Sequence, residues 1–440
     1  MRVAIFFSVK MKKRKELTGE FFAPLAGLTY SSQLAMKQKT TRKFQDEVRR
    51  ELREKCAARR YPVPAFDPRV DEIVHLPESL EISFRNKCEF TFGPEAALGF
   101  VKRVGSCDFH IEPITAENPL VPPAMRAVVD ALRSGLQEFP AYDRAKHSSG
   151  LLRTAAVRMG DQSKMSLLVQ VKKWPNEEIS RLKDKLKEIV GDERLGIVSL
   201  WIQENSGLSD ACHSPPEFLW GDSRGVAISV CGLKFQAHPM SFFQTNTRAC
   251  EMLYSLVSNW AAESLEGKLL LLDICCGVGT IGQVVAKQLL DSEIRVLGIE
   301  MVPEAVEDAR LNAHRNFGDS ASMLHFELGK VEDILPNLLK EEIATNGSFK
   351  IVAVVDPPRS GLHSSVIRSL RDNLEINTIL YVSCNPESLA RDTLLLIEPL
   401  TDCPEEEGIA VSKPFKAERV VAVDMFPNTS HCEMLLKLVR

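Results

Sequence analysis

The chain has 440 residues, which is enough for two or more domains that each bury a core. Hydrophobic residues make up 44% of the sequence and charged residues 26%, which are ordinary values for soluble globular proteins. The net charge of -4 excludes a chain that is basic throughout, so any nucleic-acid surface must be a local patch.

Cysteine spacing and hydropathy argue against two further classes of protein. The 11 cysteines include no C-x-x-C pair, which leaves a zinc ribbon or a thioredoxin-like redox site without support. No stretch reaches the roughly 18 to 20 continuous apolar residues of a membrane helix. We therefore expect no metal and no membrane partner, take a monomer as the default, and expect a cytoplasmic or nuclear location. The basic run at 10–15 also leaves a mitochondrial address open.

The first predicted element is a long polar helix over residues 34–60. Its basic residues outnumber its acidic residues Asp46, Glu47, Glu51 and Glu54, and they are Lys37, Lys39, Arg42, Lys43, Arg49, Arg50, Arg53, Lys55, Arg59 and Arg60. This excess is typical of a solvated helix or of part of a surface that holds RNA. Pro62, Pro64 and Pro68 then predict a boundary near residues 60–75, so residues 1–75 are predicted to form an N-terminal extension.

The next segment, residues 76–225, has the mixed pattern of an α+β domain. Short alternating runs at 81–84 and 166–171 predict strands, because apolar side chains recur at every second position. Residues 176–190 carry apolar side chains at helical spacing and predict an amphipathic helix.

From residue 226 to 440 the pattern changes to buried strands that alternate with helices. Four short apolar runs, at 269–273, 296–300, 351–356 and 378–383, each end in a polar residue. Such runs predict an α/β domain with a doubly wound, mostly parallel, Rossmann-like sheet. Ligands of these sheets lie at the carboxyl ends of the strands, so the chemistry is expected at those polar residues.

A glycine-rich turn follows the first of these strands. Gly277, Gly279 and Gly282 form a G-x-G-x-x-G pattern, and Glu300 follows about 20 residues on, where it can accept hydrogen bonds from ribose hydroxyls or merely cap a helix. Taken alone, this pattern fits a nicotinamide dinucleotide. Asp273, just before the glycines, favours S-adenosylmethionine instead, because a carboxylate there repels a pyrophosphate and attracts an ammonium or sulfonium group.

The loop after the third strand, Asp356–Gly361, argues against two related chemistries. Enzymes that methylate exocyclic amines place an aromatic residue after a similar acid-Pro-Pro unit, and here that position is Arg359. Enzymes that methylate carbon 5 of cytosine place a cysteine in this loop, which has none.

Cys384 directly follows the fourth predicted strand, at its tip, and precedes Asn385-Pro386. Carbon 5 of uracil is a poor nucleophile, and a thiolate that adds at carbon 6 converts the ring into an enolate that can be methylated. A lone cysteine is more often an inert buried residue. The place of Cys384, one strand after Asp356 on the cofactor side, favours the nucleophile.

Glu433 lies just before the last predicted strand, 434–439. After methylation the hydrogen on carbon 5 must leave as a proton, and a carboxylate within hydrogen-bond reach can accept it. Glu433 fits this general base, although a surface acid beside a strand would look the same. His431 has a weaker case and is expected only to support the loop.

Five motifs in this order resemble the RNA 5-methyluridine methyltransferase family. They are Ser241–Asn246, Asp273–Gly282, Asp356–Leu362, Ser383–Pro386 and Phe426–Glu433, and Phe84–Phe90 is similar to a segment of the family's central RNA-binding region. The resemblance implies a class I methyltransferase domain in which Gln244, Glu300 and Asp356 contact S-adenosylmethionine. It also implies that Cys384 is the nucleophile, that Glu433 is the proton acceptor, and that the uridine is flipped out of its stack.

The details look closest to animal tRNA enzymes that act on uridine 54 of the T loop. We therefore predict an S-adenosylmethionine-dependent tRNA (uracil-5-)-methyltransferase. Two alternatives remain, a ribosomal RNA uridine as substrate and a mainly non-catalytic protein that binds or refolds tRNA.

Overall fold

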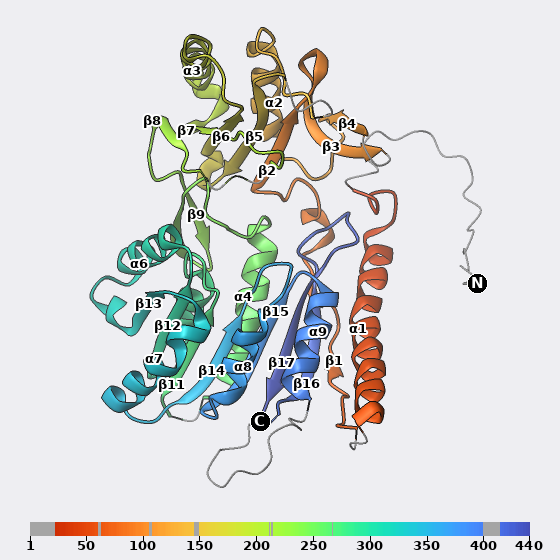
Figure 1. Cartoon of the computed structure of the whole chain (residues 1–440), viewed down its shortest axis with the longest axis vertical. Helices are drawn as coiled ribbons and strands as arrows, with labels where there is room; N and C mark the ends of the chain where they lie inside the picture. Colours follow the sequence, from red (N-terminus) through yellow and green to blue (C-terminus); the bar gives the residue numbers. More distant parts are fainter. Residues whose placement is uncertain are drawn as a thin grey trace, which may run out of the picture.

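The computed structural model describes residues 23–440 except 60–62, 105–107, 145–148, 211, 213, 266 and 399–413. Two bodies lie one above the other in Figure 1, a seven-stranded sheet at the top and an eight-stranded sheet below, and α1 (Tyr30–Arg59) runs beside the lower one. A short hairpin of β9 (Val226–Val230) and β10 (Leu233–Ala237) lies where the two bodies meet. No helix in the described part of the chain is long and apolar enough to span a bilayer.

The eight-stranded sheet is parallel except for one strand. Its order is β1 (Arg69–Val70), β16 (Lys416–Val423), β17 (Glu433–Val439), β15 (Ile376–Ser383), β14 (Lys350–Val355), β11 (Leu269–Ile274), β12 (Ile294–Glu300) and β13 (Leu324–Leu328). Among these strands β17 alone runs against its neighbours β15 and β16. The predicted mostly parallel α/β fold is confirmed, and so are the four strands that the apolar runs predicted.

Both faces of this sheet are covered by helices, which explains why its strands are apolar on both sides. Leu269 and Leu271 point into one core, with α4 (Thr247–Ala262), α5 (Thr280–Gln288) and α6 (Pro303–Phe317). Leu270 and Leu272 point into the other, with α1, α7 (Val331–Asn346), α8 (Ser364–Asp372) and α9 (Pro386–Ile397). Alternate residues of one strand therefore serve opposite cores.

The seven-stranded sheet is largely antiparallel. Its order is β4 (Asp108–Pro113), β3 (Leu98–Val104), β2 (Lys87–Phe92), β5 (Leu152–Met159), β6 (Met165–Val171), β7 (Ile197–Glu204) and β8 (Glu217–Gly221). The helices α2 (Pro123–Gly135) and α3 (Asn176–Val190) bury their apolar sides in its core. The predicted strand at 166–171 and helix at 176–190 are confirmed.

The strand predicted at 81–84 is wrong, because these residues form a bend. Ser83 has a φ of 53°, outside the extended region, and its N–H donates to the carbonyl of Pro119 at 2.6 Å. A backbone group engaged in this way cannot join a ladder of strand hydrogen bonds.

The long helix predicted at 34–60 is confirmed as α1, which begins four residues earlier, at Tyr30. Its apolar residues Phe44, Val48 and Leu52 are almost fully buried against the eight-stranded sheet and α9. Lys37 corrects the picture of a solvated basic face, because only 1% of its side chain is exposed and it forms an ion pair with Asp424. Arg59 and Arg60, which belong to the same predicted cluster, lie outside the residues whose side chains are described.

The segment after α1 returns to the carboxyl-terminal sheet. β1 pairs in parallel with β16 through Arg69 and Arg419, so residues before position 75 contribute a strand to the sheet of residues 226–440. The division of the chain at residues 75 and 225 stays a prediction.

Candidate active site

The glycine turn between β11 and α5 depends on close approach of its backbone to other residues. Gly279 has a φ of 72°, and a Cβ there would lie 2.7 Å from the ring of Phe326. A Cβ on Gly282 would lie 2.9 Å from Oδ2 of Asp273, whose carboxylate accepts a hydrogen bond from the Gly282 N–H at 2.8 Å. The glycines therefore let the helix begin directly against the strand.

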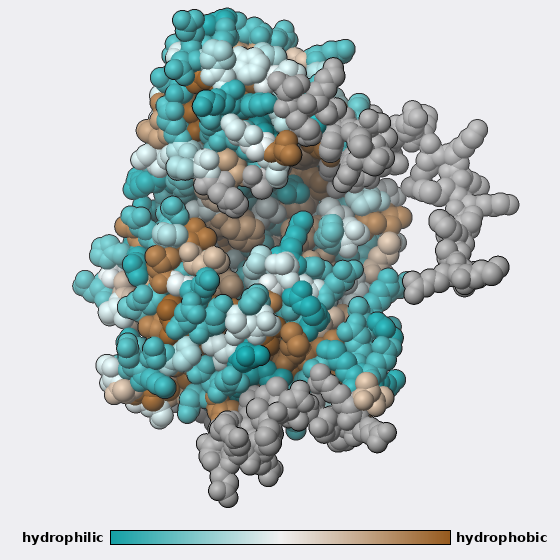
Figure 2. Space-filling model, viewed as in Figure 1, coloured by the Kyte–Doolittle hydropathy of each residue, from teal (hydrophilic) through white to brown (hydrophobic). Residues whose placement is uncertain are grey.

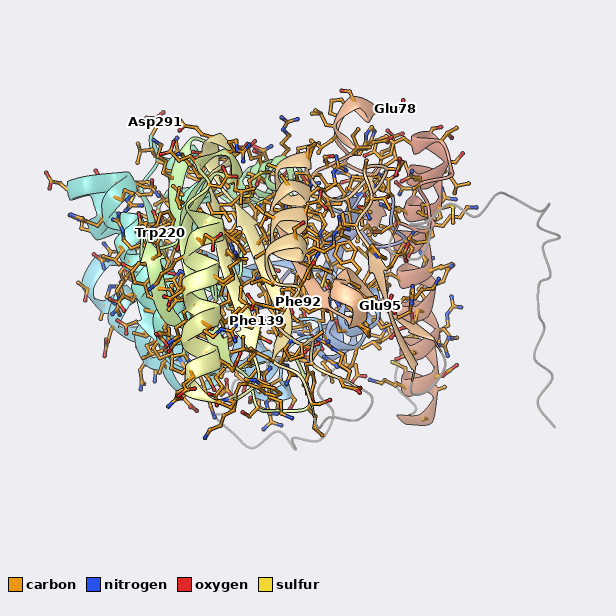
Figure 3. All side chains as sticks on the ribbon, turned by 90° about the horizontal axis from the view of Figure 1, so that it is seen from above. Glu78, Phe92, Glu95, Phe139, Trp220 and Asp291 are labelled. Atoms are coloured by element: carbon orange, nitrogen blue, oxygen red, sulfur yellow. The ribbon has the colours of Figure 1, made fainter. Side chains whose placement is uncertain are left out.

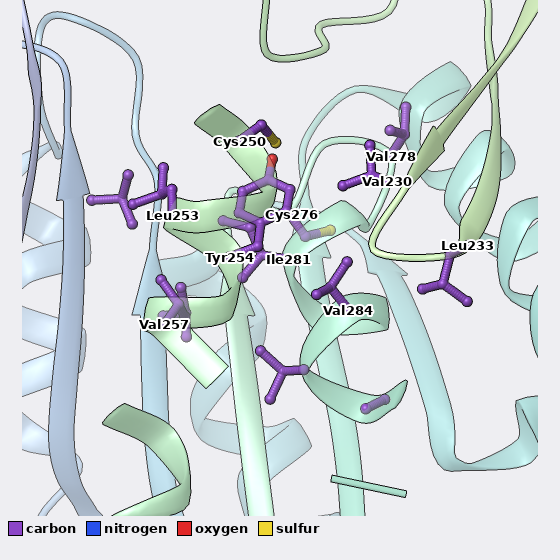
Figure 4. Packing of buried hydrophobic residues seen from close by; sticks show 14 of the residues in the cluster. Val230, Leu233, Cys250, Leu253, Tyr254, Val257, Cys276, Val278, Ile281 and Val284 are labelled. Atoms are coloured by element: carbon purple, nitrogen blue, oxygen red, sulfur yellow. The ribbon is translucent and has the colours of Figure 1, made fainter. Parts of the chain in front are cut away.

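The core beneath the turn fixes its position. Figure 4 shows Tyr254 of α4 beside Cys276 and Ile281, with Cys250 close to its hydroxyl. The Tyr254 hydroxyl is hydrogen-bonded to the hydroxyl of Thr280 at 3.1 Å, and Thr280 is the first residue of α5. The start of α5 is thus held by a buried polar contact as well as by apolar packing.

Glu300 closes the turn from the end of β12. Its carboxylate accepts hydrogen bonds from the backbone N–H groups of Gly277 at 3.1 Å, Met301 at 2.8 Å and Val302 at 3.0 Å. The contacts with Met301 and Val302 match the capping alternative, and the contact with Gly277 places the acid at the glycine turn. A carboxylate has about four acceptor sites, so this partly exposed side chain retains capacity for a further donor.

Asp273 is a buried carboxyl with an unused oxygen. Its side chain is 1% exposed, and Oδ1 has no hydrogen-bond partner in the described residues. Burial, together with the nearby Asp356 and Glu300, raises the pKa of Asp273 to about 7. A bound cation would relieve this concentration of negative charge, whereas a pyrophosphate would increase it.

Asp356 and Gln244 contact each other at the end of β14. Burial raises the pKa of Asp356, and a hydrogen bond from the Gln244 side chain opposes that rise. Gln244 itself is 5% exposed, and its backbone carbonyl accepts a hydrogen bond from Nδ2 of Asn86 at 2.8 Å. The backbone N–H of Asn86 also donates to the Thr245 carbonyl at 2.7 Å, so this edge of the sheet faces the seven-stranded body.

Cys384 follows β15, at the same edge of the sheet as Asp356. Its side chain is partly exposed, and Asn385 begins α9 by accepting a hydrogen bond from the Glu387 N–H at 3.2 Å. Burial and then the charge of Glu433 raise the pKa of the Cys384 thiol, whereas the charge of Arg359 and its hydrogen bond to the thiol oppose the rise. The thiol is therefore accessible, with a cation beside it and a carboxyl close by.

Arg359 is the site residue that sequence reasoning missed. Its charge acts on the Cys384 thiol, whose pKa it lowers. Its backbone carbonyl accepts a hydrogen bond from Nδ2 of Asn385 at 2.9 Å. One signal could have identified it. The strand before Arg359 and the strand before Cys384 were both predicted to be parallel, so their carboxyl ends meet at one edge.

Glu433 reaches the site because β17 is antiparallel. Met434 pairs with Ser383, which sets the start of β17 beside the end of β15. The side chain of Glu433 is 2% exposed, and burial followed by Asp356 raises its pKa well above the usual range, with Arg359 opposing. Such a carboxyl can accept a proton readily once it is ionised.

His431 lies in the loop between β16 and β17, two residues before Glu433. Burial first, and then Arg359 and Lys37, lower the pKa of its imidazole. Its backbone N–H donates to Oγ1 of Thr429 at 3.3 Å, within the loop that precedes β17. This contact agrees with a supporting place in the loop.

A depression of about 990 Å³ lies elsewhere, on the seven-stranded body, and includes Phe92, Glu95 and Phe139, which are labelled in Figure 3. Its two basic residues, Arg133 and Arg144, already form ion pairs with carboxylates. The candidate site is instead the edge of the eight-stranded sheet, because the carboxyl and thiol groups with raised pKa values gather there. No group of three or more side chains suited to holding a metal ion occurs in the described ranges.

Three comparisons identify relatives of this chain. A family model described as tRNA (uracil-5-)-methyltransferase matches residues 226–440. Human tRNA (uracil-5-)-methyltransferase homolog A is 34% identical over 382 residues, which is 83% of this chain and 57% of that protein. Human homolog B is 34% identical over 302 residues, or 67% of this chain and 56% of that protein.

A solved structure extends the similarity to the fold. The tRNA (uracil-54, C5)-methyltransferase of Pyrococcus abyssi, solved in complex with S-adenosyl-L-homocysteine, has a TM-score of 0.64 and 25% identity. The match covers 94% of this chain and 85% of that chain. This chain spans 57% of the length of homolog A. With all five motifs at or near one sheet edge and the family model matched over residues 226–440, the chain belongs to the tRNA (uracil-5-)-methyltransferase family.

Proposed function

We propose that this protein methylates carbon 5 of a uridine in tRNA, with S-adenosylmethionine as the methyl donor. The observation that carries the proposal is the meeting of Cys384, Arg359 and Glu433 at one sheet edge, next to the acidic cofactor side. A candidate nucleophile, a cation and a candidate proton acceptor would thereby lie beside a site that suits a cationic cofactor.

The acidic side fits S-adenosylmethionine better than a dinucleotide. Asp273 and Asp356 have raised pKa values, and Oδ1 of Asp273 is buried with no partner in the described residues, so a sulfonium or ammonium group would be stabilised there. Glu300 would accept from the ribose hydroxyls. The nicotinamide alternative rests on the glycine turn alone and requires a pyrophosphate near these acids.

An apolar strip beside Glu300 suits an adenine ring. Met301 is 65% exposed, and Val302 and Leu328 are each 46% exposed, while Leu328 pairs with Glu300 across β12 and β13. Exposed apolar side chains at the carboxyl ends of parallel strands are typical of a ligand site. Gln244 would hold Asp356 in orientation through their hydrogen bond.

When bound, the cofactor supplies an electrophilic methyl group. Cys384 would act first, as its thiolate adds to carbon 6 of the uracil and the ring electrons move to the carbonyl at carbon 4 as an enolate. After carbon 5 has received the methyl group, Glu433 would accept the proton of carbon 5. The bond between sulfur and carbon 6 then breaks, its electron pair returns to the thiolate, and the double bond of the ring is restored.

Arg359 would favour both deprotonated groups. Its positive charge lowers the pKa of the Cys384 thiol and of the Glu433 carboxyl against the opposing effect of burial. It would therefore increase the fraction of thiolate before addition and the fraction of carboxylate before proton removal.

Uridine 54 of the T loop is the proposed target, supported by the specificity named for the Pyrococcus abyssi relative. The base would be flipped out of its stack, at a cost of a few kcal/mol that is smallest in a loop. The surface is hollowed between the two bodies in Figure 2. We propose that a flipped base would enter there and that the seven-stranded body would hold the RNA.

One experiment tests the whole proposal. Purified protein is incubated with labelled S-adenosylmethionine and unmodified tRNA, and the nucleosides are identified by mass spectrometry. We expect 5-methyluridine, which disappears when the T-loop uridine is replaced by cytidine. Intact binding of S-adenosylhomocysteine without this product would favour the ribosomal RNA or the non-catalytic tRNA-binding alternative.

A further inference from the structure

The loop between β16 and β17 is held by a helix that is far away in sequence. Nζ of Lys37 on α1 donates to Oδ1 of Asp424 at 2.5 Å and to the carbonyl of Phe426 at 2.9 Å. The hydroxyl of Tyr30, also on α1, donates to Oδ2 of Asp424 at 3.0 Å. The side chains of Lys37 and Asp424 are 1% and 0% exposed, so this ion pair is sealed from water.

A second attachment lies four residues further along the loop. Nε2 of Gln33 donates to Oδ1 of Asn428 at 3.1 Å, and the backbone N–H of Asn428 donates back to Oε1 of Gln33 at 2.8 Å. Asn428 has a φ of 65°. This left-handed conformation costs energy and persists only where the surrounding structure holds it in place. The Leu25 N–H donates to the Asn428 carbonyl at 3.0 Å and completes the support.

The loop continues directly into the proposed proton acceptor. Glu433 is the first residue of β17 and follows Asn428 by five positions. On the opposite side of the loop, Nδ2 of Asn246 donates to the Met425 carbonyl at 3.1 Å, and Asn246 lies two residues after Gln244. The loop is thus fixed between α1 and the segment that carries Gln244.

A buried ion pair is a weak means of stabilising a fold, because well-packed apolar residues often serve as well or better. Directed hydrogen bonds do specify the path of a backbone. Lys37 and Gln33 contact backbone groups of the loop, including the N–H of Asn428. Such contacts fix the direction of the backbone, which burial of apolar side chains alone would not do.

We propose that Lys37 and Gln33 are positioning residues that hold loop 424–432 so that Glu433 faces carbon 5 of the uracil. The inference rests on the proposed function and assigns α1 to one step of it. Without these contacts Cys384 still adds and carbon 5 is still methylated, but proton removal slows and the protein stays covalently attached to carbon 6.

The test uses the full chain with unmodified tRNA in three variants. Lys37→Met removes the cation, and Gln33→Met removes the second attachment with no change of charge. Lys340→Met is the matched control, since Lys340 is an exposed lysine on α7, away from the loop and from the basic residues of α1. Single-turnover reactions with labelled S-adenosylmethionine are sampled in denaturant, and the protein–RNA adduct and the released methylated tRNA are quantified separately.

We expect Lys37→Met and Gln33→Met to accumulate an adduct that carries the label, with release of methylated tRNA slowed by roughly tenfold to a hundredfold. Both variants should bind S-adenosylhomocysteine with the affinity of the wild type, and Lys340→Met should behave as the wild type in every measurement. Equal slowing of adduct formation and release, or no change in release, overturns the inference. Should Lys37→Met fail to fold, Gln33→Met decides the question, because it keeps the ion pair.

A further arm separates this inference from the proposed function. Wild-type protein is mixed with S-adenosylmethionine and tRNA that contains 5-fluorouridine. Once carbon 5 has received the methyl group, its fluorine cannot leave as a proton, so a stable adduct forms if the proposed chemistry is correct. No adduct overturns the proposed function and this inference with it. An adduct with the wild type, together with unaltered release in both variants, overturns this inference alone.

Discussion

Arg359 lies beside the thiol of Cys384, in the loop that follows the neighbouring strand, and its guanidinium opposes the rise in the pKa of that thiol. The same guanidinium acts on the carboxyl of Glu433, so a single cation opposes the effect of burial at two acidic groups. In the proposed reaction both groups must lose a proton, and they do so at different steps. In the proposed reaction Arg359 would therefore assist both the addition of sulfur and the later removal of the proton from carbon 5.

Replacing Cys384 by alanine is expected to abolish methylation, because no other described thiol lies at the end of β15. The rate of 5-methyluridine formation should fall by roughly 10⁴-fold or more. The adduct with 5-fluorouridine tRNA should also disappear on denaturing gels. Cys212→Ala serves as the control, since Cys212 is a partly exposed thiol outside the site. Normal turnover by Cys384→Ala would show that the proposed mechanism is wrong.

Replacing Arg359 by methionine is expected to move the pH dependence of kcat/KM to higher pH. Loss of the cation raises the pKa of both Cys384 and Glu433, and both must be deprotonated, so activity rises only at more alkaline pH. Arg359→Lys should recover part of the shift. Arg368→Met, at an exposed position of α8, is the control. A uniform loss of activity with an unmoved pH profile would instead point to a role in RNA binding.

Asp273→Asn is expected to stabilise the protein without cofactor while weakening cofactor binding. The pKa of Asp273 is about 7 in the folded state against an ordinary value of 3.8, so the folded state binds more protons between these values. Stability therefore falls as pH rises from about 4 to about 7, by a few kcal/mol in total. Bound cofactor would offset that loss.

Melting curves at pH 6 and pH 8, with and without S-adenosylmethionine, check this prediction. At pH 8 and without cofactor, the melting temperature of Asp273→Asn should be higher than that of the wild type. Addition of cofactor should raise the melting temperature of the variant less than that of the wild type. Asp46→Asn, at an exposed position of α1, should change neither quantity. A variant that binds the cofactor as tightly as the wild type would contradict the electrostatic role of Asp273.

Gly282→Ala tests the close approach of α5 to β11. Alanine in a helix is normally favoured over glycine by about 1 kcal/mol. Here its Cβ would lie 2.8 Å from Cγ1 of Val296 and 2.9 Å from Oδ2 of Asp273, so we expect a net destabilisation of about 1 to 3 kcal/mol. Denaturant unfolding measures the difference, with the exposed Gln288→Ala of the same helix as control. A more stable Gly282→Ala protein would show that the turn relaxes freely.

The parts of the molecule that follow local patterns were predictable from the sequence. Strands buried on both faces give continuous apolar runs, and the glycine turn and Cys384 lie directly at the ends of such runs. The family motifs and the fold agree with the comparisons, whereas the individual roles of Gln244, Glu300, Asp356, Cys384 and Glu433 stay proposals.

The features that escaped prediction depend on contacts between distant segments. Lys37 looked like one of many solvated cations, because its partner Asp424 is 387 residues away. Arg359 carries no periodic signal, and only the adjacency of β14 and β15 brings it to Cys384. The bend at Ser83 results from a hydrogen bond to Pro119, which no local pattern records.

The docking of α1 on the last strands has a consequence for how the protein is made. Tyr30 and Asp424, which meet in the folded state, are separated by 394 residues. At about 5 to 20 residues per second, the ribosome delivers Asp424 roughly 20 to 80 seconds after Tyr30. During that interval the apolar stripe of Phe44, Val48 and Leu52 has neither β16 nor α9 to cover it. The helix that would hold the proton acceptor is therefore synthesised well before the segments on which it docks, and its apolar stripe stays uncovered until those segments have been made.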